Sequence, residues 1–99
     1  MNTGFNVVWT EEAARNVDSV IDYLQENWSQ REVQRFLGKL RERVWLISQN
    51  PELFPESKVV QNTRRSVLSK QITIYYRVES LQIEILHVFD TRQNPHKLK

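Results

Sequence analysis

The chain has 99 residues with 14 Lys/Arg against 12 Asp/Glu, which allows one globular domain over residues 1–99 with a modest core. It contains no cysteine, which excludes a disulfide framework and thiolate chemistry. No signal pattern opens the chain and no apolar run approaches the roughly 18 residues that span a bilayer, so we expect a soluble, cytoplasmic protein without a membrane contact. Residues 51–99 carry eight Lys/Arg against five Asp/Glu. This excess suits an acidic partner or a polyanion, and a solvated surface explains it as well.

The first predicted elements are a short strand and a helix. Residues 5–9 (FNVVW) are β-branched and aromatic, which is typical of a strand. Thr10 precedes two glutamates, so it is a good N-cap, and the acidic residues suit the positive end of the helix dipole. A helix over residues 11–27 is predicted because apolar residues recur there at steps of three and four. This stripe consists of Ala14, Val17, Ile21, Leu24 and Trp28.

A second helix follows after only one or two residues, so the two should pack as an antiparallel hairpin. Ser29 and Glu32 form a capping-box pair, and the proline after Asn50 ends the helix, because the residue before a proline is disfavoured in the α region. Gly38 lies inside the helix at a cost of about 1 kcal/mol relative to alanine, so we expect the first helix to approach closely there. The apolar stripe consists of Val33, Phe36, Leu37, Leu40, Val44 and Ile47.

The second half of the chain predicts a loop and three strands. The loop, residues 51–57, contains two prolines. The strands are residues 59–60 continued by 64–68, then 71–78, then 82–89, with connections of hairpin length. The last of these becomes apolar on both faces, which indicates a central strand. We therefore expect an α+β fold of order β-α-α-β-β-β, in which the helical hairpin packs on a mainly antiparallel twisted sheet and the first strand adds at an edge.

Three stretches carry a resemblance to a known family. They are VVWTEEAARNVDSVIDYLQEN (residues 7–27), NPELFP (residues 50–55) and QITIYYRVESLQIEILHVFDTRQNP (residues 71–95). Together with the length and the predicted element order, they make nearly the whole chain resemble the RelE/ParE toxins of bacterial type II toxin–antitoxin systems. The W-T-x-x-A start and the FDTRQNP end are most similar to the ParE branch, which is associated with plasmid stabilisation.

The resemblance implies one of two activities. RelE-type members cleave mRNA in the ribosomal A site without a metal, whereas ParE-type members bind and poison DNA gyrase and are not nucleases. Members of both types are neutralised by a small antitoxin protein that wraps the toxin. The resemblance therefore implies an antitoxin partner, no metal or other cofactor, and either DNA gyrase or the ribosome with its mRNA as the target.

Several residues count against RNA cleavage, which needs an acid, a base and cations at the scissile phosphate. RelE-like nucleases often carry a Y-R-x-x-Y pattern on the middle strand. Aligned on Tyr76, the arginine position of that pattern is Thr73 here. Such nucleases also often show His-Arg after the last strand and a tyrosine near the end, where this chain has Asp90 and Pro95. These departures favour a ParE-like binding protein with no catalytic residues of its own.

A nuclease site could still be assembled from other residues. His87 can act as an acid or base near neutral pH, because histidine titrates there. Arg65, Arg77 and Arg92 can each bind phosphate through a guanidinium group. Tyr75 can stack on a base. If the chain is a nuclease, the histidine and the three arginines are its candidate catalytic residues.

Most of these candidates also have a structural interpretation. His87 follows Ile85 on the same strand face, as a packed histidine would. Arg77 lies opposite Glu84, which predicts a cross-strand ion pair. Arg64 and the arginine after it begin a strand, where they are either solvated or in contact with a macromolecule.

The tryptophans and the polar end of the chain are the remaining candidates for contact surfaces. We expect Trp9 and Trp28 in the core, whereas Trp45 lies off the second helical stripe. It either packs under the loop of residues 51–57 or widens an apolar face that an antitoxin helix would cover. The residues expected to contact a target or an antitoxin are Arg64, Arg65, Trp45, Tyr75 and Arg92.

Residues 90–95 (DTRQNP) raise the question of why a dense polar cluster follows the best-buried strand. We expect it to act as a structural clamp in which Arg92 pairs with Asp90 or lies on an aromatic ring, and in which Pro95 stops the strand ladder. The alternative is a target-binding surface.

The first hypothesis for the function of the whole chain is a ParE-like toxin that inhibits DNA gyrase. The alternatives are a ribosome-dependent mRNA endonuclease and a non-toxic descendant.

Overall fold

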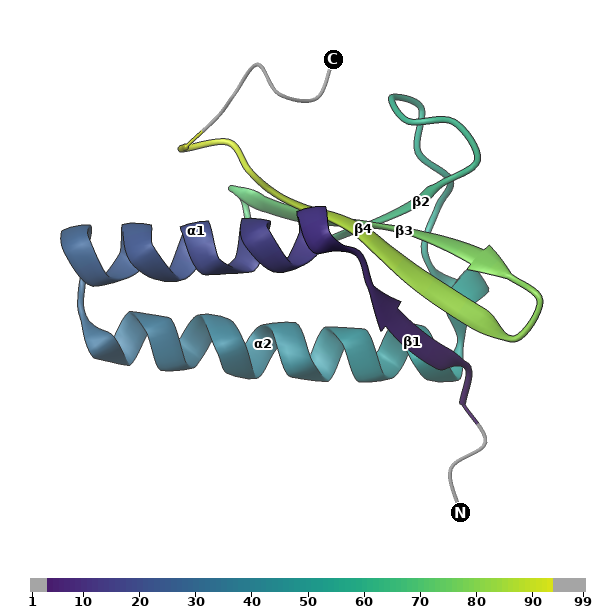
Figure 1. Cartoon of the computed structure of the whole chain (residues 1–99), viewed down its shortest axis with the longest axis horizontal. Coiled ribbons are helices and arrows are strands. Elements are labelled where there is room, and N and C mark those ends of the chain that lie inside the picture. Colours follow the sequence, from purple (N-terminus) through teal and green to yellow (C-terminus); the bar gives the residue numbers. More distant parts are fainter. Residues whose placement is uncertain (1–3, 94–99) are drawn as a thin grey trace.

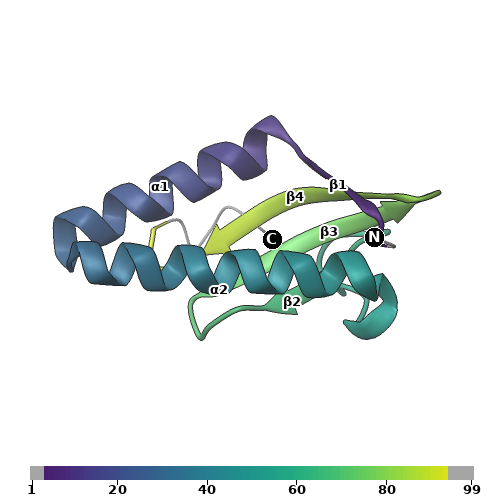
Figure 2. The ribbon, with the colours of Figure 1, turned by 90° about the horizontal axis from the view of Figure 1, so that it is seen from below.

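Two helices lie on one face of a four-stranded sheet in the computed structural model, which describes residues 4–93 (Figures 1 and 2). The sheet order is β1-β4-β3-β2, with β1 parallel to β4 and the other neighbours antiparallel. The predicted α+β fold, the edge position of the first strand and the central position of residues 82–89 are therefore confirmed. The elements are β1 (Asn6–Trp9), α1 (Glu11–Asn27), α2 (Gln30–Gln49), η1 (Pro51–Leu53), β2 (Arg64–Val67), β3 (Ile72–Glu79) and β4 (Gln82–Asp90).

Both helices begin at the predicted caps. The Oγ1 atom of Thr10 accepts a hydrogen bond from the amide of Ala13 at 3.1 Å and donates to the carbonyl of Ile85 at 2.9 Å. The capping residue of α1 therefore also joins the helix to the central strand β4 by a hydrogen bond. The Oγ atom of Ser29 accepts from the amide of Glu32 at 3.4 Å at the start of α2. A capping hydrogen bond of this kind stabilises a helix by about 1 kcal/mol.

The apolar stripes of the helices form the core against the sheet, with three corrections on α1 and its flanks. The predicted stripe of α2 is confirmed. In α1, however, Ala14 is exposed, and Ala13 is buried in its place. Trp28 is 63% exposed because it is the C-cap of α1, with non-helical backbone angles that take it out of the stripe. Trp9 is 38% exposed because it ends the edge strand β1. The prediction that Trp9 and Trp28 lie in the core is therefore wrong.

Gly38 is not needed for close packing of the helices. A Cβ atom added there would meet no heavy atom within 4 Å, so the predicted close approach of α1 is wrong.

The segment between α2 and β2 also differs from prediction. Val59 and Val60 form no strand, because their amides donate to the Oγ atom of Ser57 and turn the chain. Glu56 instead makes an isolated bridge with Arg64 beside β2.

A β-bulge in the β3–β4 hairpin decides which side chains share a face. Tyr75 pairs with His87, but Tyr76 pairs with Ile85, so Leu86 is an extra residue on β4. Side chains after the bulge therefore change face relative to those before it. The prediction that His87 shares the face of Ile85 is wrong: Ile85 points into the core, and His87 lies on the sheet face that the helices leave open.

Candidate functional site

The open face of the sheet brings three of the predicted residues into one row. Tyr75 on β3 is the register partner of Arg65 on β2 and of His87 on β4. The rings of Tyr75 and His87 meet edge to face, with centroids 6.5 Å apart and planes at 80°. The side chain of Tyr75 is nevertheless only 6% exposed, so it offers little ring surface on which a base could stack.

Arg77 lies on the same open face and is engaged by its neighbour strand. Its register partner on β4 is Glu84, and the Nε atom lies 3.9 Å from the Oε1 atom of that glutamate. The predicted cross-strand pair is confirmed. A carboxylate beside this guanidinium group competes with any phosphate for it, which weakens the case for Arg77 as a phosphate ligand.

Arg64 and Arg65 do not act together, because they lie on opposite faces of β2. Arg64 is the register partner of Tyr76 on the helix side, and its Nη1 atom donates to the carbonyl of Phe54 at 2.7 Å. Burial raises the pKa of the Tyr76 hydroxyl to about 12, and the nearby charge of Arg64 opposes that rise. Arg65 is exposed on the open face. Of the two arginines, only Arg65 is presented to a partner on that face.

The polar end of β4 forms a clamp on α1. Asp90 is 4% exposed and accepts hydrogen bonds from the Nε and Nη2 atoms of Arg92, both at 3.0 Å. The guanidinium carbon of Arg92 lies 4.9 Å from the ring centroid of Tyr23, and the side-chain amide of Gln93 donates to the carbonyl of Ser19 at 2.7 Å.

Both contacts predicted for Arg92, with Asp90 and with an aromatic ring, are present in this clamp. The hydrogen bond with Asp90 raises the pKa of the Arg92 guanidinium. Arg92 therefore lies on the helix side of the sheet and does not join the row of Arg65, Tyr75 and His87. Asn94 and Pro95, which were also expected to contribute, lie outside the described residues.

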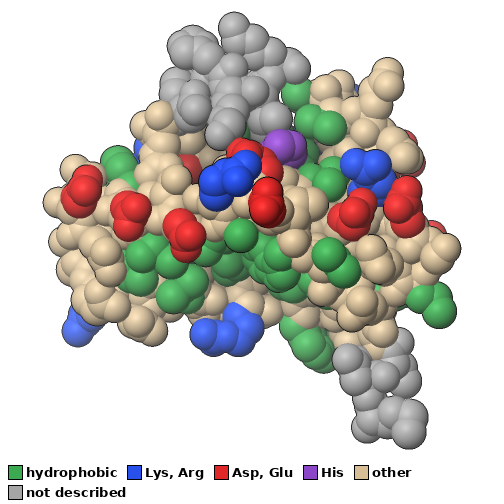
Figure 3. Space-filling model, viewed as in Figure 1, with side chains coloured by type: hydrophobic (Ala, Val, Ile, Leu, Met, Phe, Trp, Pro, Cys, Tyr) green, Lys and Arg blue, Asp and Glu red, His purple; other side chains and the backbone are tan. Residues whose placement is uncertain are grey.

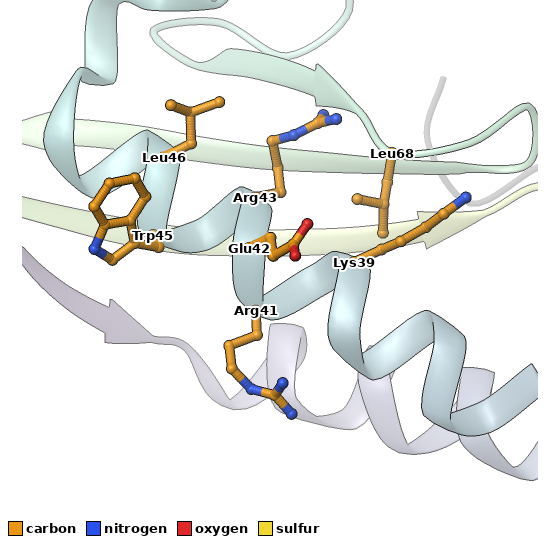
Figure 4. A pocket seen from close by; sticks show the side chains of 7 residues that line it. All are labelled: Lys39, Arg41, Glu42, Arg43, Trp45, Leu46 and Leu68. Carbon is orange, nitrogen blue, oxygen red and sulfur yellow. The ribbon is translucent and has the colours of Figure 1, made fainter. Parts of the chain in front are cut away.

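Trp45 is 63% exposed, so it does not pack under the loop after α2, and the alternative of an exposed apolar face is the one that the structure supports. It borders an open groove of about 840 Å³ between α2 and β2, which we call the α2 groove (Figure 4). The groove is lined by Lys39, Arg41, Glu42, Arg43, Trp45, Leu46 and Leu68.

Arg43 lines this groove and ties α2 to β2, and it was not among the residues singled out from the sequence. Its Nη1 atom donates to the Oγ atom of Ser66 at 2.7 Å and to the carbonyl of Val67 at 2.8 Å. Its guanidinium carbon lies 5.3 Å from the ring centroid of Phe54. The available signal was its position four residues before Ile47, which places it at the border of the apolar stripe of α2.

The two helices carry opposite charge. Within α1 there are five acidic residues and one arginine, and Figure 3 shows a row of acidic side chains over this helix with apolar side chains beside it. Within α2 there are five basic and two acidic residues. An acidic partner is therefore attracted to the α2 side of the molecule and repelled from the α1 side.

A sequence model of the family described as "ParE toxin of type II toxin-antitoxin system, parDE" matches residues 7–95. The chain belongs to this family. The predicted resemblance to the RelE/ParE superfamily is thereby confirmed. No curated protein sequence matches the chain.

Solved structures show how widely this ParE-family fold is shared. The chromosomal ParDE toxin–antitoxin system from P. aeruginosa matches with a TM-score of 0.76 and 21% identity, covering 90% of this chain and 98% of that one. A YoeB/ParE toxin from Agrobacterium tumefaciens matches with a TM-score of 0.60 and 14% identity, covering 86% and 96%. The E. coli DinJ–YafQ toxin–antitoxin complex matches with a TM-score of 0.60 and 10% identity, covering 90% and 94%. At these identities the matches establish the fold alone.

Among residues 4–93, no three His, Asp or Glu side chains lie together as ligands for a metal ion. No helix in that range is long and apolar enough to cross a membrane.

Proposed function

We propose that this ParE-family toxin acts by binding DNA gyrase rather than by cleaving RNA, and that an antitoxin protein neutralises it. The observation that carries the proposal is the separation of the four nuclease candidates. Arg92 is held by Asp90 on the helix side of the sheet, and Arg77 is paired with Glu84. Arg65 and His87 share one register row on the open face, and Arg77 lies on the same face beside its partner Glu84.

Two groups in one row do not make the site that metal-free cleavage requires. The reaction needs an acid, a base and cations that stabilise the charge on the phosphate. The arginine expected on the middle strand is replaced by Thr73, and Tyr75 beside it is buried. A protein-binding mechanism needs none of these groups.

An antitoxin partner is supported by the matching toxin–antitoxin structures and by exposed apolar side chains on this chain. Trp45 is more than half exposed, and surface tryptophans of this kind are enriched at protein interfaces. The cytoplasm, where gyrase and ribosomes both reside, is the compartment in which the proposed activity would operate.

The second candidate function, mRNA cleavage, is favoured by one observation: Arg65, Tyr75 and His87 share one register row across three strands. The register brings a cation, a hydroxyl and an imidazole to one face, which is the minimum from which such a site could be built.

The test compares both activities with the purified chain. We expect inhibition of supercoiling by DNA gyrase, and accumulation of cleaved DNA, at protein concentrations that leave ribosome-bound mRNA intact in a primer-extension assay. Arg65→Ala and His87→Ala should leave the effect on gyrase within about threefold. If instead mRNA is cleaved on the ribosome and His87→Ala abolishes the cleavage, the chain is an endonuclease.

A further inference from the structure

The two outer edges of the sheet differ in how they are protected. The outer edge of β2 is engaged by the rest of the chain, because the amide of Arg65 donates to the carbonyl of Pro55 and the carbonyl of Val67 accepts from Arg43. The other edge strand, β1, reads NVVW and contains neither a charged residue nor a proline. Natural sheets usually protect an edge with such residues, since unpaired backbone groups are a template for pairing with another chain.

The backbone of β1 has two residues whose polar groups point away from the sheet. The amides of Asn6 and Thr10 donate to carbonyls of β4. Because the backbone groups of successive strand residues point to opposite edges, Val8 also faces β4, whereas Val7 and Trp9 face outward. Within the described part of the chain, neither outward residue has a hydrogen-bond partner for its amide or its carbonyl.

The two outward residues are complementary to the same two residues of a second copy. If two β1 strands pair antiparallel about a twofold axis at Val8, Val7 of each copy lies opposite Trp9 of the other. Outward residues that lie opposite each other exchange both of their backbone hydrogen bonds. With the axis at Val7 instead, Trp9 would face Phe5, whose amide already donates to the carbonyl of Ser48. The register centred on Val8 is therefore the one that satisfies every free group of this edge.

We propose that this chain forms a twofold-symmetric dimer through the outer edges of β1. The axis passes between the two Val8 residues, perpendicular to the sheet, so the two sheets join into one continuous sheet with all the helices on the same side. This is strand addition, in which main-chain hydrogen bonds supply affinity and the side chains fix the register. The contact is isologous, since both copies use the same residues.

Side chains on both faces of β1 suit this pairing. Trp9 is 38% exposed and shares the helix side of the strand with Val7, which packs against the core. In the dimer its ring would lie across from Val7 of the second copy, and an aromatic side chain opposite a β-branched one is a favourable cross-strand pair. On the open face, the two half-buried Val8 side chains would meet at the axis as an apolar pair.

The charges beside this edge are complementary between two copies. Glu11, whose side chain is 95% exposed, begins α1 directly after β1. The start of β1 lies against the end of α2, where the amide of Phe5 donates to the carbonyl of Ser48 at 2.8 Å. Arg41 is exposed about two turns before Ser48, and residues at that spacing share one face of a helix.

Antiparallel pairing brings the end of one β1 to the start of the other. Glu11 of each copy would therefore approach Arg41 of the other copy, with an attraction at both ends of the interface. Figure 4 shows Arg41 pointing to the side of α2 on which β1 and α1 lie, away from Arg43.

Other surfaces fit a second copy less well. The α2 groove is lined mainly by basic residues among its charged ones, so two copies placed groove to groove would repel each other. The acidic face of α1 would repel itself in the same way. The edge of β1 is uncharged and has opposite charges at its two ends, which is what a symmetric contact requires.

The test measures the mass of the purified chain by sedimentation velocity over a range of concentrations, and wild type should shift from monomer to dimer. Val8→Lys and Val8→Glu should each weaken the dimer at least tenfold, because like charges would lie directly opposite each other at the axis. An equimolar mixture of the two variants should return to within threefold of the wild-type dissociation constant, since the opposed charges then attract.

The matched control is Val67→Lys. It adds the same charge on the open face of the other edge strand, β2, where the valine side chain is 50% exposed. The dissociation constant of the dimer should stay within threefold of wild type.

A second pair of variants leaves the strand itself unchanged, so it decides the matter if the Val8 variants do not fold. Glu11→Lys should weaken the dimer at least threefold, because it would face Arg41 of the other copy. Glu11→Lys combined with Arg41→Glu should restore the dimer, since the attraction is only reversed in direction. Both side chains are exposed, so folding should be preserved, as circular dichroism would show.

Four results would overturn the inference. A chain that stays monomeric at every concentration has no such dimer. A dimer that persists in folded Val8→Lys and in Glu11→Lys is formed through another surface. A mixture of folded Val8→Lys and Val8→Glu that stays monomeric rules out the axis at Val8. A dimer that Val67→Lys weakens equally responds to added charge and not to the register of β1. None of these measurements uses gyrase or an antitoxin, so the proposed function is tested separately.

Discussion

Replacing Arg92 by alanine should lower the free energy of unfolding by about 3 kcal/mol. The side chain of Asp90 is 2% exposed, and Arg92 donates to both of its oxygens at 3.0 Å. Removing one partner of a buried ion pair costs roughly 3–5 kcal/mol, because the other charge is left uncompensated. The lower end applies here, since the side chain of Arg92 is itself 25% exposed and its backbone amide still donates to Asp90 at 2.9 Å.

Urea unfolding followed by circular dichroism measures this difference. Arg92→Lys keeps the charge but loses the two-pronged geometry and the contact with Tyr23, so we expect it to cost about half as much as alanine. Arg31→Ala removes an exposed arginine at the start of α2 and should change stability by less than about 0.5 kcal/mol. The slope of free energy against urea concentration should be unchanged in each variant, which shows that the folded states are equally compact.

A small effect would refute the reasoning. If Arg92→Ala and Arg31→Ala are equally mild, the clamp does not hold the end of β4, and Arg92 becomes available again as a contact for a target. If Arg92→Ala is destabilising but Arg92→Lys is not, then charge alone matters and the geometry of the pair does not.

Three further predictions concern stability. Gly38→Ala should raise the free energy of unfolding by about 0.5–1 kcal/mol in urea, because glycine is unfavourable inside a helix and an added Cβ meets no atom within 4 Å; a loss of stability would mean that a neighbour is closer. Arg43→Ala should cost about 2 kcal/mol by the same assay, because it removes the bonds from α2 to Ser66 and Val67, and a neutral result would contradict that role. The pKa of Tyr76 is raised to about 12 from a usual value of 10, so its stabilising contribution should be complete below pH 10 and decline as pH rises from 10 through 12. Unfolding midpoints over that range should fall more steeply for wild type than for Tyr76→Phe, and parallel curves would refute this assignment.

Signals that are local in the sequence predicted most of the fold. Thr10 and Ser29 begin helices because each offers an oxygen to an amide three residues later, and that preference needs no tertiary context. The stripe of α2 and the apolar run of residues 82–89 likewise reflect burial that recurs with a regular period. The element order and the central position of β4 followed from these signals.

What the sequence did not predict depends on contacts between distant residues. The bulge at Leu86 reverses the face of His87, and no local pattern marks an extra residue in one strand of a pair. The predicted end of α1 at residue 27 is correct, but Trp28 was counted in the apolar stripe although it is the C-cap, where the backbone is no longer helical and the helical period does not apply.

In the candidate site, too, contacts between residues close in the sequence were predictable and contacts between distant residues were not. The pairing of Arg77 with Glu84 was predictable because the strands are adjacent in the sequence and joined by a short turn. Arg92 was expected on an aromatic ring, but Tyr23 lies 69 positions away, so the sequence did not indicate which ring it would be. The bond from Arg43 to Val67 joins residues 24 positions apart and was not predicted. The α2 groove could not be predicted, because it forms between α2 and the end of β2, which are distant in the sequence.

The most direct test of the account is pulse labelling of new DNA and new protein in a bacterium after induction of this chain alone. DNA synthesis should stop first, because the proposed target is gyrase and the candidate nuclease residues Arg77 and Arg92 are engaged by Glu84 and Asp90. If protein synthesis stops first, and His87→Ala with Arg65→Ala restores it, the row on the open face of the sheet is a catalytic site and the central claim is wrong.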